Sequence, residues 1–347
     1  MKYTYHEYRS RIVDQLLFPF TSQDWLKDYD DFLTQGQLKH LQASFEKISE
    51  FEQVLKPYYS DIKQFLVSVN PVWNIPLSLY LHYLDLGKDP ASVEEFLNMM
   101  SQASDKDIKS SILRHLDHNW EGDVLSVDEF MELLEEDVES ESQRWRFLWA
   151  YRHPRAFFDG IVDLYQKVLP LYTPFYELSK ERNKAFGKTL DLVTLYQESQ
   201  YNIPELIEQS GRENCEIFII SDWYAFNAIN YDDTLNTGMV YCFIYPEISH
   251  FLHEKDDVTT EKLAISLKTL GDETRYQVLL ASIKENIKSK DIAKELGITS
   301  ANVTFHTQKL INADILRLST KKNSSKYHIN KELIRTIIER LKTDLNL

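Results

Sequence analysis

The most informative stretch of the chain is Ser289-Lys290-Asp291-Ile292-Ala293-Lys294-Glu295-Leu296-Gly297-Ile298-Thr299-Ser300-Ala301-Asn302-Val303-Thr304-Phe305-His306. Apolar residues recur at helical spacing on both sides of Gly297, which can adopt the backbone of a tight turn. The small side chain of Ala293 suits the close crossing of two helices. A short helix, a glycine turn and a second helix that starts at Thr299 or Ser300 are typical of a helix-turn-helix.

The neighbouring residues extend this pattern to the whole C-terminal segment, 259–347. Helices are expected from Thr260, as the cap, to Leu270 before Gly271, and from Asp272 to Ile283. After Ile315 the hydrophobic period changes to two, so that 316–318 and 326–329 predict strands on either side of a basic, polar hairpin tip. A last helix is expected from Lys331 to about Thr343, with Leu333, Ile337 and Leu341 on one stripe. The segment therefore predicts a winged helix-turn-helix.

This segment resembles the winged helix-turn-helix of ArsR-type bacterial transcriptional regulators. Residues 267–279 resemble the family's L-K-A-L-A-D-P-T-R-x-x-I-L opening, and 291–306 resemble its E-L-A-x-x-L-G-L-S-x-S-T-V-S-x-H run. Residues 312–316 stand where the family has E-A-G-L-V. The resemblance covers about 85 residues, and it implies a DNA-binding regulator that dimerises through the first and last helices of the module. The stripe of Leu333, Ile337 and Leu341 fits that dimer, and packing onto the N-terminal domain is an equally plain alternative.

Metal sensing of the family's kind is not expected. Relatives that sense metals use Cys on the first helix of the motif or Asp and His on the last helix. Here no Cys occurs at 289–293, and no Asp or His occurs at 331–341. Two other pairs, His115 with His118 and His250 with His253, have spacing that suits a metal, but two ligands do not make a site. We therefore predict neither a metal nor a cofactor.

The second helix of the motif is expected to enter the major groove of double-stranded DNA. Short polar side chains at its N-terminal end can meet phosphates and base edges, and Asn302 is the best candidate for reading adenine. Basic side chains around it are expected to contact phosphates. The predicted DNA-binding residues are Lys290, Thr299, Ser300, Asn302, Thr304, His306, Lys309, Lys321, Lys322 and Lys326. Thr299 has a second interpretation as a helix cap, and Val303 and Leu310 are expected in the core.

The net charge of −15 hides an asymmetry that supports this interpretation. Residues 259–347 contain 16 Lys and Arg against 10 Asp and Glu, whereas the remaining 258 residues contain 23 against 44. Such a division suggests that one end of the chain meets a polyanion while the other end does something else. We expect residues 1–255 to form an acidic sensing or interaction domain, divisible near 87–90, with a small-molecule effector as a candidate partner.

The N-terminal region is expected to be rich in helices, so the whole chain is expected to be mainly α. Helical spacing covers 37–56, a segment from 143 to 151, 154–170 and 173–200, and capping-box patterns start at Ser92 and Ser126. Residues 216–220 and 240–245 predict strands of a small antiparallel sheet. Cys215 and Cys242 lie in or beside these strands, and are expected to be buried neighbours rather than a redox switch.

The stretch 143–155 combines four Arg with four aromatic residues inside this acidic region. Arg146, Trp149 and Arg152 are candidates for binding an anionic or planar ligand. The alternative is an amphipathic helix with Trp in the core and Arg paired with acidic neighbours. Motifs of nucleotide-binding and hydrolytic enzymes are absent, so we do not expect an enzyme. The competing hypothesis is an enzyme or ligand-processing domain fused to an autoregulatory DNA-binding tail.

The location of the protein follows from what the sequence lacks. The first residues have no apolar signal-peptide core, and the apolar run 239–245 is far too short to span a bilayer. With only two Cys, the chain suits a reducing compartment. We expect a cytoplasmic protein without a membrane partner.

Overall fold

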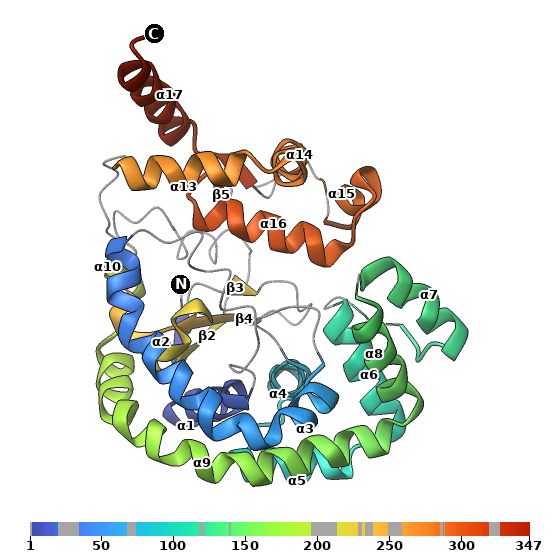
Figure 1. Ribbon diagram of the computed structural model, residues 1–347. Helices are drawn as coiled ribbons and strands as arrows, with labels where there is room; N and C mark the ends of the chain where they lie inside the picture. Colours follow the sequence, from blue (N-terminus) through green and yellow to red (C-terminus); the bar gives the residue numbers. More distant parts are fainter. Residues whose placement is uncertain are drawn as a thin grey trace. The chain divides into compact units, whose positions relative to one another are not determined.

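The computed structural model describes residues 2–19, 35–67, 74–117, 120, 122–138, 140–195, 214–227, 231–232, 239–248, 259–284, 287, 289–318 and 327–347. These residues are mainly α-helical, with a four-stranded sheet and a two-stranded hairpin (Figure 1). They form two compact units, which we describe separately. The first contains 2–19, 43–190 and 214–248, and the second contains 259–347 together with 35–42 and 191–195. None of the described helices combines the length and the apolar character needed to cross a membrane.

The sheet of the first unit has the order β1-β2-β4-β3, with β1 at Lys2–Tyr5, β2 at Asn214–Ile219, β4 at Met239–Ile244 and β3 at Tyr231–Asp232. β2 runs parallel to both β1 and β4, and the short β3 is antiparallel to β4. The expected antiparallel pairing of 216–220 with 240–245 is therefore wrong. Both strands are continuous buried runs, which is typical of parallel strands covered on both faces. The chain between them includes a 3-10 segment, Asp222–Asn227, and makes a crossover instead of a hairpin.

Helices surround this sheet and confirm the prediction of a mainly α protein. They are α1 (Glu7–Leu17), α2 (Gln35–Leu55) from residue 43 onward, α3 (Tyr59–Phe65), α4 (Ile75–Asp85), α5 (Val93–Gln102), α6 (Asp105–Leu116), α7 (Val127–Asp137), α8 (Glu141–Arg152) and α9 (Pro154–Thr189), with 3-10 turns at Lys56–Tyr58 and Pro246–Ile248. The short α10 (Leu192–Leu195) belongs to the second unit. Ser126 and Glu129 form the expected reciprocal capping box. Ser92 caps α5, but Glu95 accepts from the backbone of Ala91 instead.

The long helix α9 corrects another expectation. The sequence suggested one helix that ends at Pro170 and another that starts at Thr173, but a single helix continues through Pro170 and Pro174. Proline removes one intrahelical hydrogen bond and disfavours a helix interior. Here Leu169, Tyr172 and Tyr176 remain buried on one side, so tertiary packing outweighs the local penalty. Figure 1 shows α9 as the long green helix below the sheet.

The second unit follows the predicted order of elements. It contains α13 (Thr260–Leu270), α14 (Glu273–Ser282), α15 (Ser289–Leu296), α16 (Ser300–Asn312), the antiparallel strands β5 (Leu316–Leu318) and β6 (Tyr327–Ile329), and α17 (Lys331–Leu345). One shared core joins them, and it includes Val278, Ile292, Val303, Leu310, Ile315, Leu333 and Ile337. The stripe of Leu333, Ile337 and Leu341 therefore packs within its own module, and the expectation that it faces a second copy or the N-terminal domain is wrong. Thr259 caps α13, one residue before the expected Thr260. α17 extends past the expected end and so includes Asp344, which pairs with Arg340 at 2.9 Å.

Two left-handed backbone positions shape the turns of this unit. Gly297 has φ +66° between α15 and α16, as predicted. Asp314, with φ +56°, stands where the ArsR-type pattern has glycine. Its carboxylate accepts two hydrogen bonds from Arg317, at 2.8 and 2.9 Å, and one from Asn330 Nδ2 at 2.8 Å. Asn330 also caps α17. These contacts hold Asp314 in a conformation that L-residues rarely adopt.

Candidate nucleic-acid interface

The orientation of α16 is fixed by its buried side. Val303 and Leu310 are almost fully buried, as predicted, and Thr307 lies between them with its hydroxyl donating to the carbonyl of Val303. α14 and α15 pack against this side. Thr304, Phe305 and Gln308, on the other side of the helix, therefore face away from the core. The consequence is a defined exposed side on the helix that follows the glycine turn.

The N-terminal turn of α16 has a structural cap. The hydroxyl of Thr299 accepts a hydrogen bond from the backbone N–H of Asn302 at 3.1 Å, so the capping interpretation of Thr299 is confirmed. Ser300 and Asn302 are partly buried on the first turn. A helix N-terminus carries partial positive charge and free N–H groups, which suit a phosphate.

Exposed residues lie along the middle of α16. Thr304 is exposed and donates to the carbonyl of Ser300 at 3.1 Å, and Gln308 is exposed with its amide bonded to Asn312. Phe305 is 38% exposed, and the ammonium of Lys309 lies 4.1 Å from its ring centroid. Sequence reasoning did not include Phe305 or Gln308 among the site residues. The available signal was helical spacing: Phe305 follows Ala301 by four residues and Gln308 follows Thr304 by four residues, so both lie on the same side as these two.

Two further predicted residues, His306 and Lys290, lie within the described residues. His306 is half-buried on α16 beside Phe305, with 5.5 Å between the ring centroids. Lys290 is exposed at the start of α15. Lys321, Lys322 and Lys326 lie outside the described residues. Of the predicted residues that the structure describes, Ser300, Asn302, Thr304, His306 and Lys309 lie on α16, with Asn302 and Lys309 on one flank and Ser300 and Thr304 on the other.

Of the two histidine pairs, only His115 lies within the described residues. His115 is buried on α6, with its Nδ1 3.1 Å from the hydroxyl of Ser78 and its ring stacked on Phe147. His118, His250 and His253 lie outside the described residues. Within the described ranges, no three metal-ligating side chains gather in a group. His115 therefore has the contacts of a core histidine.

The arginine and tryptophan candidates lie on α8. Phe147 and Tyr151 occupy its buried side, whereas Arg146, Trp149 and Arg152 lie toward the opposite side. Trp149 is partly exposed and contacts Phe65 and His153. Trp145, which sequence reasoning did not single out, is 67% exposed. The alternative with both tryptophans in the core is wrong for Trp145.

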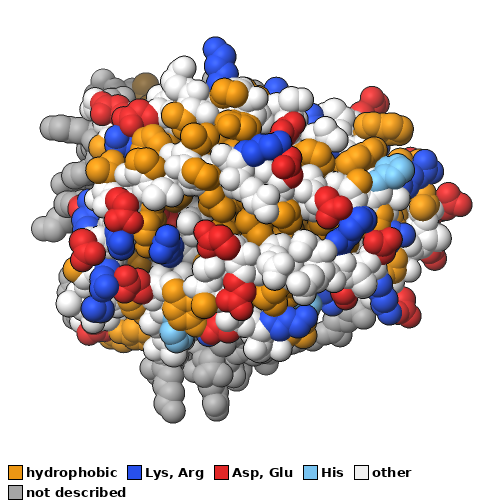
Figure 2. All heavy atoms as spheres, turned by 90° about the horizontal axis from the view of Figure 1, so that it is seen from below, with side chains coloured by type: hydrophobic (Ala, Val, Ile, Leu, Met, Phe, Trp, Pro, Cys, Tyr) orange, Lys and Arg blue, Asp and Glu red, His pale blue; other side chains and the backbone are white. Residues whose placement is uncertain are grey.

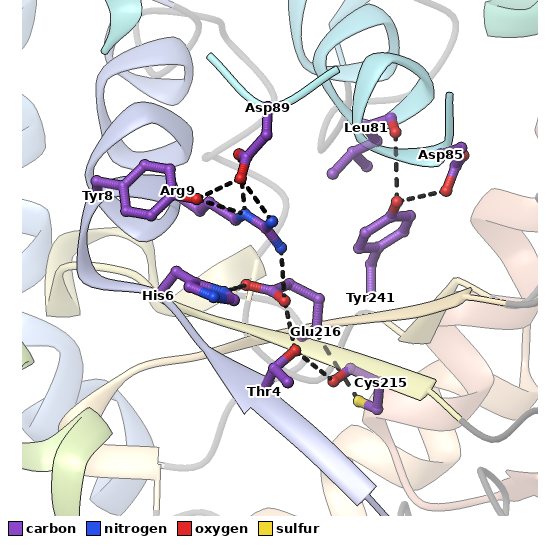
Figure 3. Close-up of polar contacts among 10 residues, drawn as sticks. All are labelled: Thr4, His6, Tyr8, Arg9, Leu81, Asp85, Asp89, Cys215, Glu216 and Tyr241. Carbon is purple, nitrogen blue, oxygen red and sulfur yellow. Dashed lines mark hydrogen bonds and ion pairs between the residues drawn. The ribbon is translucent and has the colours of Figure 1, made fainter. Parts of the chain in front are cut away.

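A charged cluster is built where β1 passes into α1 (Figure 3). Glu216 is buried on β2, and its carboxylate accepts hydrogen bonds from Thr4 at 2.6 Å and from Arg9 at 2.9 Å, with His6 Nδ1 at 3.0 Å. Arg9 also binds Asp89 bidentately, and Tyr8 donates to the same carboxylate. Although burial acts in the opposite direction, these hydrogen bonds lower the pKa of Asp89. Every charge in the cluster has a partner, which is typical of a structural network.

A second polar network joins α1 to the end of β2. Asp14 is fully buried, and its carboxylate accepts hydrogen bonds from the backbone and hydroxyl of Ser221, at 2.9 and 2.6 Å, and from Tyr172 at 2.9 Å. Burial raises the pKa of Asp14 to about 6, although these donors act to lower it. On the neighbouring strands, the sulfur atoms of Cys215 and Cys242 lie 3.7 Å apart and both residues are buried, as expected.

On the face seen in Figure 2, acidic and basic side chains are interspersed with hydrophobic ones, so the acidic surplus does not form one continuous field there. The chain matches no protein-family model, no curated protein and no solved structure.

Proposed function

We propose that the protein is a sequence-specific, DNA-binding transcriptional regulator of the cytoplasm whose second unit is an ArsR-like winged helix. The observation that carries this proposal is the division of α16 into a locked buried side and an exposed side with short polar groups. A helix held in this way can enter the major groove with its exposed side first. The basic balance of 259–347 supplies the attraction to phosphates.

In this proposal, some residues of the second unit contact phosphates and position the protein, and others read the base sequence. Asn302, Thr304 and Gln308 carry hydrogen-bonding groups that suit base edges. Ser300 and the N-terminal turn of α16 suit a phosphate, together with Lys290 and Lys309. Lys321, Lys322 and Lys326 belong to the proposed wing. His306, half-buried on the same helix, remains a candidate for a phosphate or base contact.

A second copy of the chain is the proposed partner of α13 and α17. Leu267 on α13 is 41% exposed, and Ile338 and Leu345 on α17 are 46% and 63% exposed. Isolated apolar side chains are common on surfaces, but three on the first and last helices of one module support a two-fold contact. Two copies would place two recognition helices on a pseudo-palindromic site.

The first unit is the proposed regulatory part, which responds to a small-molecule effector or a protein partner. Its acidic balance supports a role away from the DNA, because phosphates repel carboxylates.

Selection from a pool of random duplexes tests the proposal. The full-length chain should enrich one motif, and an inverted repeat would indicate the dimer. Binding to the enriched duplex is then compared between wild type, Gln308→Ala, Thr304→Ala and the control Lys106→Ala, whose side chain is exposed on α6. The two α16 variants should lose affinity for the motif and the control should not. Failure to enrich any motif, or equal losses for all three variants, would reject the proposal.

A further inference from the structure

The helices α7 and α8 form a hairpin with opposite charges on its two exposed sides. They pack through Phe130 and Tyr151, whose rings stack with centroids 3.9 Å apart at 14°. Tyr151 also donates to the carbonyl of Leu125 at 2.8 Å, just before α7. These contacts hold the buried sides together, so the remaining side of each helix is turned away from the hairpin core.

The exposed side of α8 is aromatic and basic. Trp145, which is 67% exposed, is followed on the same side by Trp149 and Arg152, at steps of four and three residues, and Arg146 lies at the edge of this side. Neither Arg146 nor Arg152 forms an ion pair or hydrogen bond with another described residue. A large exposed tryptophan flanked by unpaired arginines is typical of a contact surface, because Trp and Arg are enriched where partners bury their interfaces.

The exposed side of α7 is acidic. Asp128, Glu132, Glu135 and Glu136 are exposed there, and Met131 is 40% exposed among them. Among the described residues, none of these four carboxylates has an ion-pair partner. Like charges crowded on one helix face are destabilising unless something neutralises them. The carboxylates of α7 therefore need cations, and the exposed side of α8 carries arginines of the kind that would neutralise them.

We propose that these two surfaces bind each other between two copies of the chain, with the acidic side of α7 of one copy on the basic side of α8 of the other. One hairpin carries both halves of the contact, so a two-fold axis forms the contact twice, which is the self-complementarity that an isologous interface requires. Met131 and Trp145 supply apolar anchors beside the charges. The interface is independent of the proposed contact through α13 and α17 and of DNA binding.

Cross-linking between differently labelled full-length chains tests the contact. One chain carries Met131→Cys on α7 and the other carries Ser142→Cys, on the exposed side of α8. Cys215 and Cys242 are buried and should not react with a short bis-maleimide. A mixture of the two chains should give covalent dimer in clear excess over either chain alone. Equal yields in the mixture and in the separate chains would overturn the proposal.

Charge reversal then tests whether the charges carry the contact. Adding Arg146→Glu and Arg152→Glu to the Ser142→Cys chain should lower its cross-linking to the unreversed partner by about tenfold. Adding Glu132→Lys and Glu135→Lys to the Met131→Cys chain should restore it, because both contacts of the mixed dimer are complementary again. The control Lys63→Glu with Lys106→Glu changes the net charge equally at other exposed sites and should have no effect. With circular dichroism unchanged, cross-linking that survives the first reversal, or is not restored by the second, would reject the proposal.

Discussion

Nη1 of Arg9 donates to Oε2 of Glu216 at 2.9 Å, which joins the start of α1 to the central strand β2 across 207 residues of sequence. Glu216 is fully buried on β2 between apolar neighbours, and Arg9 is mostly covered. A buried carboxylate needs its partners because the protein interior solvates charge poorly. This pair makes the stability of the first unit depend on one side chain of α1.

Removal of that side chain should destabilise the first unit. Arg9→Ala leaves Glu216 with Thr4 and His6 as partners, and the loss of a buried ion pair typically costs about 3–5 kcal/mol. We expect a loss near the lower limit of that range, measured by urea unfolding of the full chain. Glu216→Gln should cost less because a neutral amide has no charge to leave unpaired. A larger loss for Glu216→Gln than for Arg9→Ala would contradict the assignment.

Stability should also depend on pH through Asp14. Its pKa is raised from 3.8 to about 6 in the folded chain, so the folded state binds more protons than the unfolded state between these values. The free energy of unfolding therefore falls as the pH rises through this window, by on the order of 3 kcal/mol from this group. Asp14→Asn should lack this component. Unfolding measured at intervals from pH 4 to 7 for both proteins checks the difference, and parallel profiles would refute it.

The turn after α16 should tolerate glycine better than alanine. Asp314 has φ +56°, and a side chain with a Cβ is strained there unless local contacts hold it. Asp314→Ala keeps the strain and loses the bonds to Arg317 and Asn330, whereas Asp314→Gly loses the bonds and relieves the strain. The difference should be about 1 kcal/mol in favour of glycine. Thermal unfolding of both variants measures it, and a more stable alanine variant would argue against strain at this position.

Base readout should be separable from affinity at Asn302. Asn302→Ala should weaken the binding free energy by on the order of 1–3 kcal/mol on the duplex enriched by selection, and by little on random DNA. Its position on the first turn of α16, beyond the cap formed by Thr299, motivates this expectation. Fluorescence anisotropy with both duplexes provides the measurement. Equal losses on the two DNAs would remove Asn302 from the residues that read sequence.

The proposed wing should act through charge alone. Lys321→Ala with Lys322→Ala should weaken binding to the selected duplex and to random DNA similarly, because a lysine ammonium is mainly a point charge and does not read base edges. Each lost phosphate contact should flatten the log–log dependence of affinity on salt by about 0.9. Titrations at several salt concentrations test this expectation. An unchanged slope would mean that these lysines are solvated.

The second unit was largely predictable because its signals are local. Helical spacing identified Val303 and Leu310 as core, and Gly297 identified the turn, since each depends on neighbours within a few residues. Asp314 could not be assigned a left-handed backbone from sequence alone, because Arg317 and Asn330, which hold it there, become its neighbours only in the fold.

The first unit was less predictable because its sheet depends on distant pairs. The strand at 2–5 is short and its partner lies at 214–217, so no local pattern connected them. The parallel pairing of β2 with β4 was missed for a similar reason, since two buried strands close in sequence also fit a hairpin. The exposure of Trp145 was not predictable either, because the helical pattern of α8 does not reveal which side finds a partner.

The pairing of β1 with β2 has a consequence for synthesis of the chain on the ribosome. β1 emerges before its partner at 214–219, which follows only after the intervening helices. Until β2 has been synthesised, β1 has no strand to pair with. The helices of the first unit therefore expose part of their apolar surface during this time. The core of the segment 259–347 joins residues close in sequence, so this segment can fold soon after it emerges. Slow elongation should therefore increase misfolding of the first unit more than of the second. Chaperones should bind mainly to residues before 214.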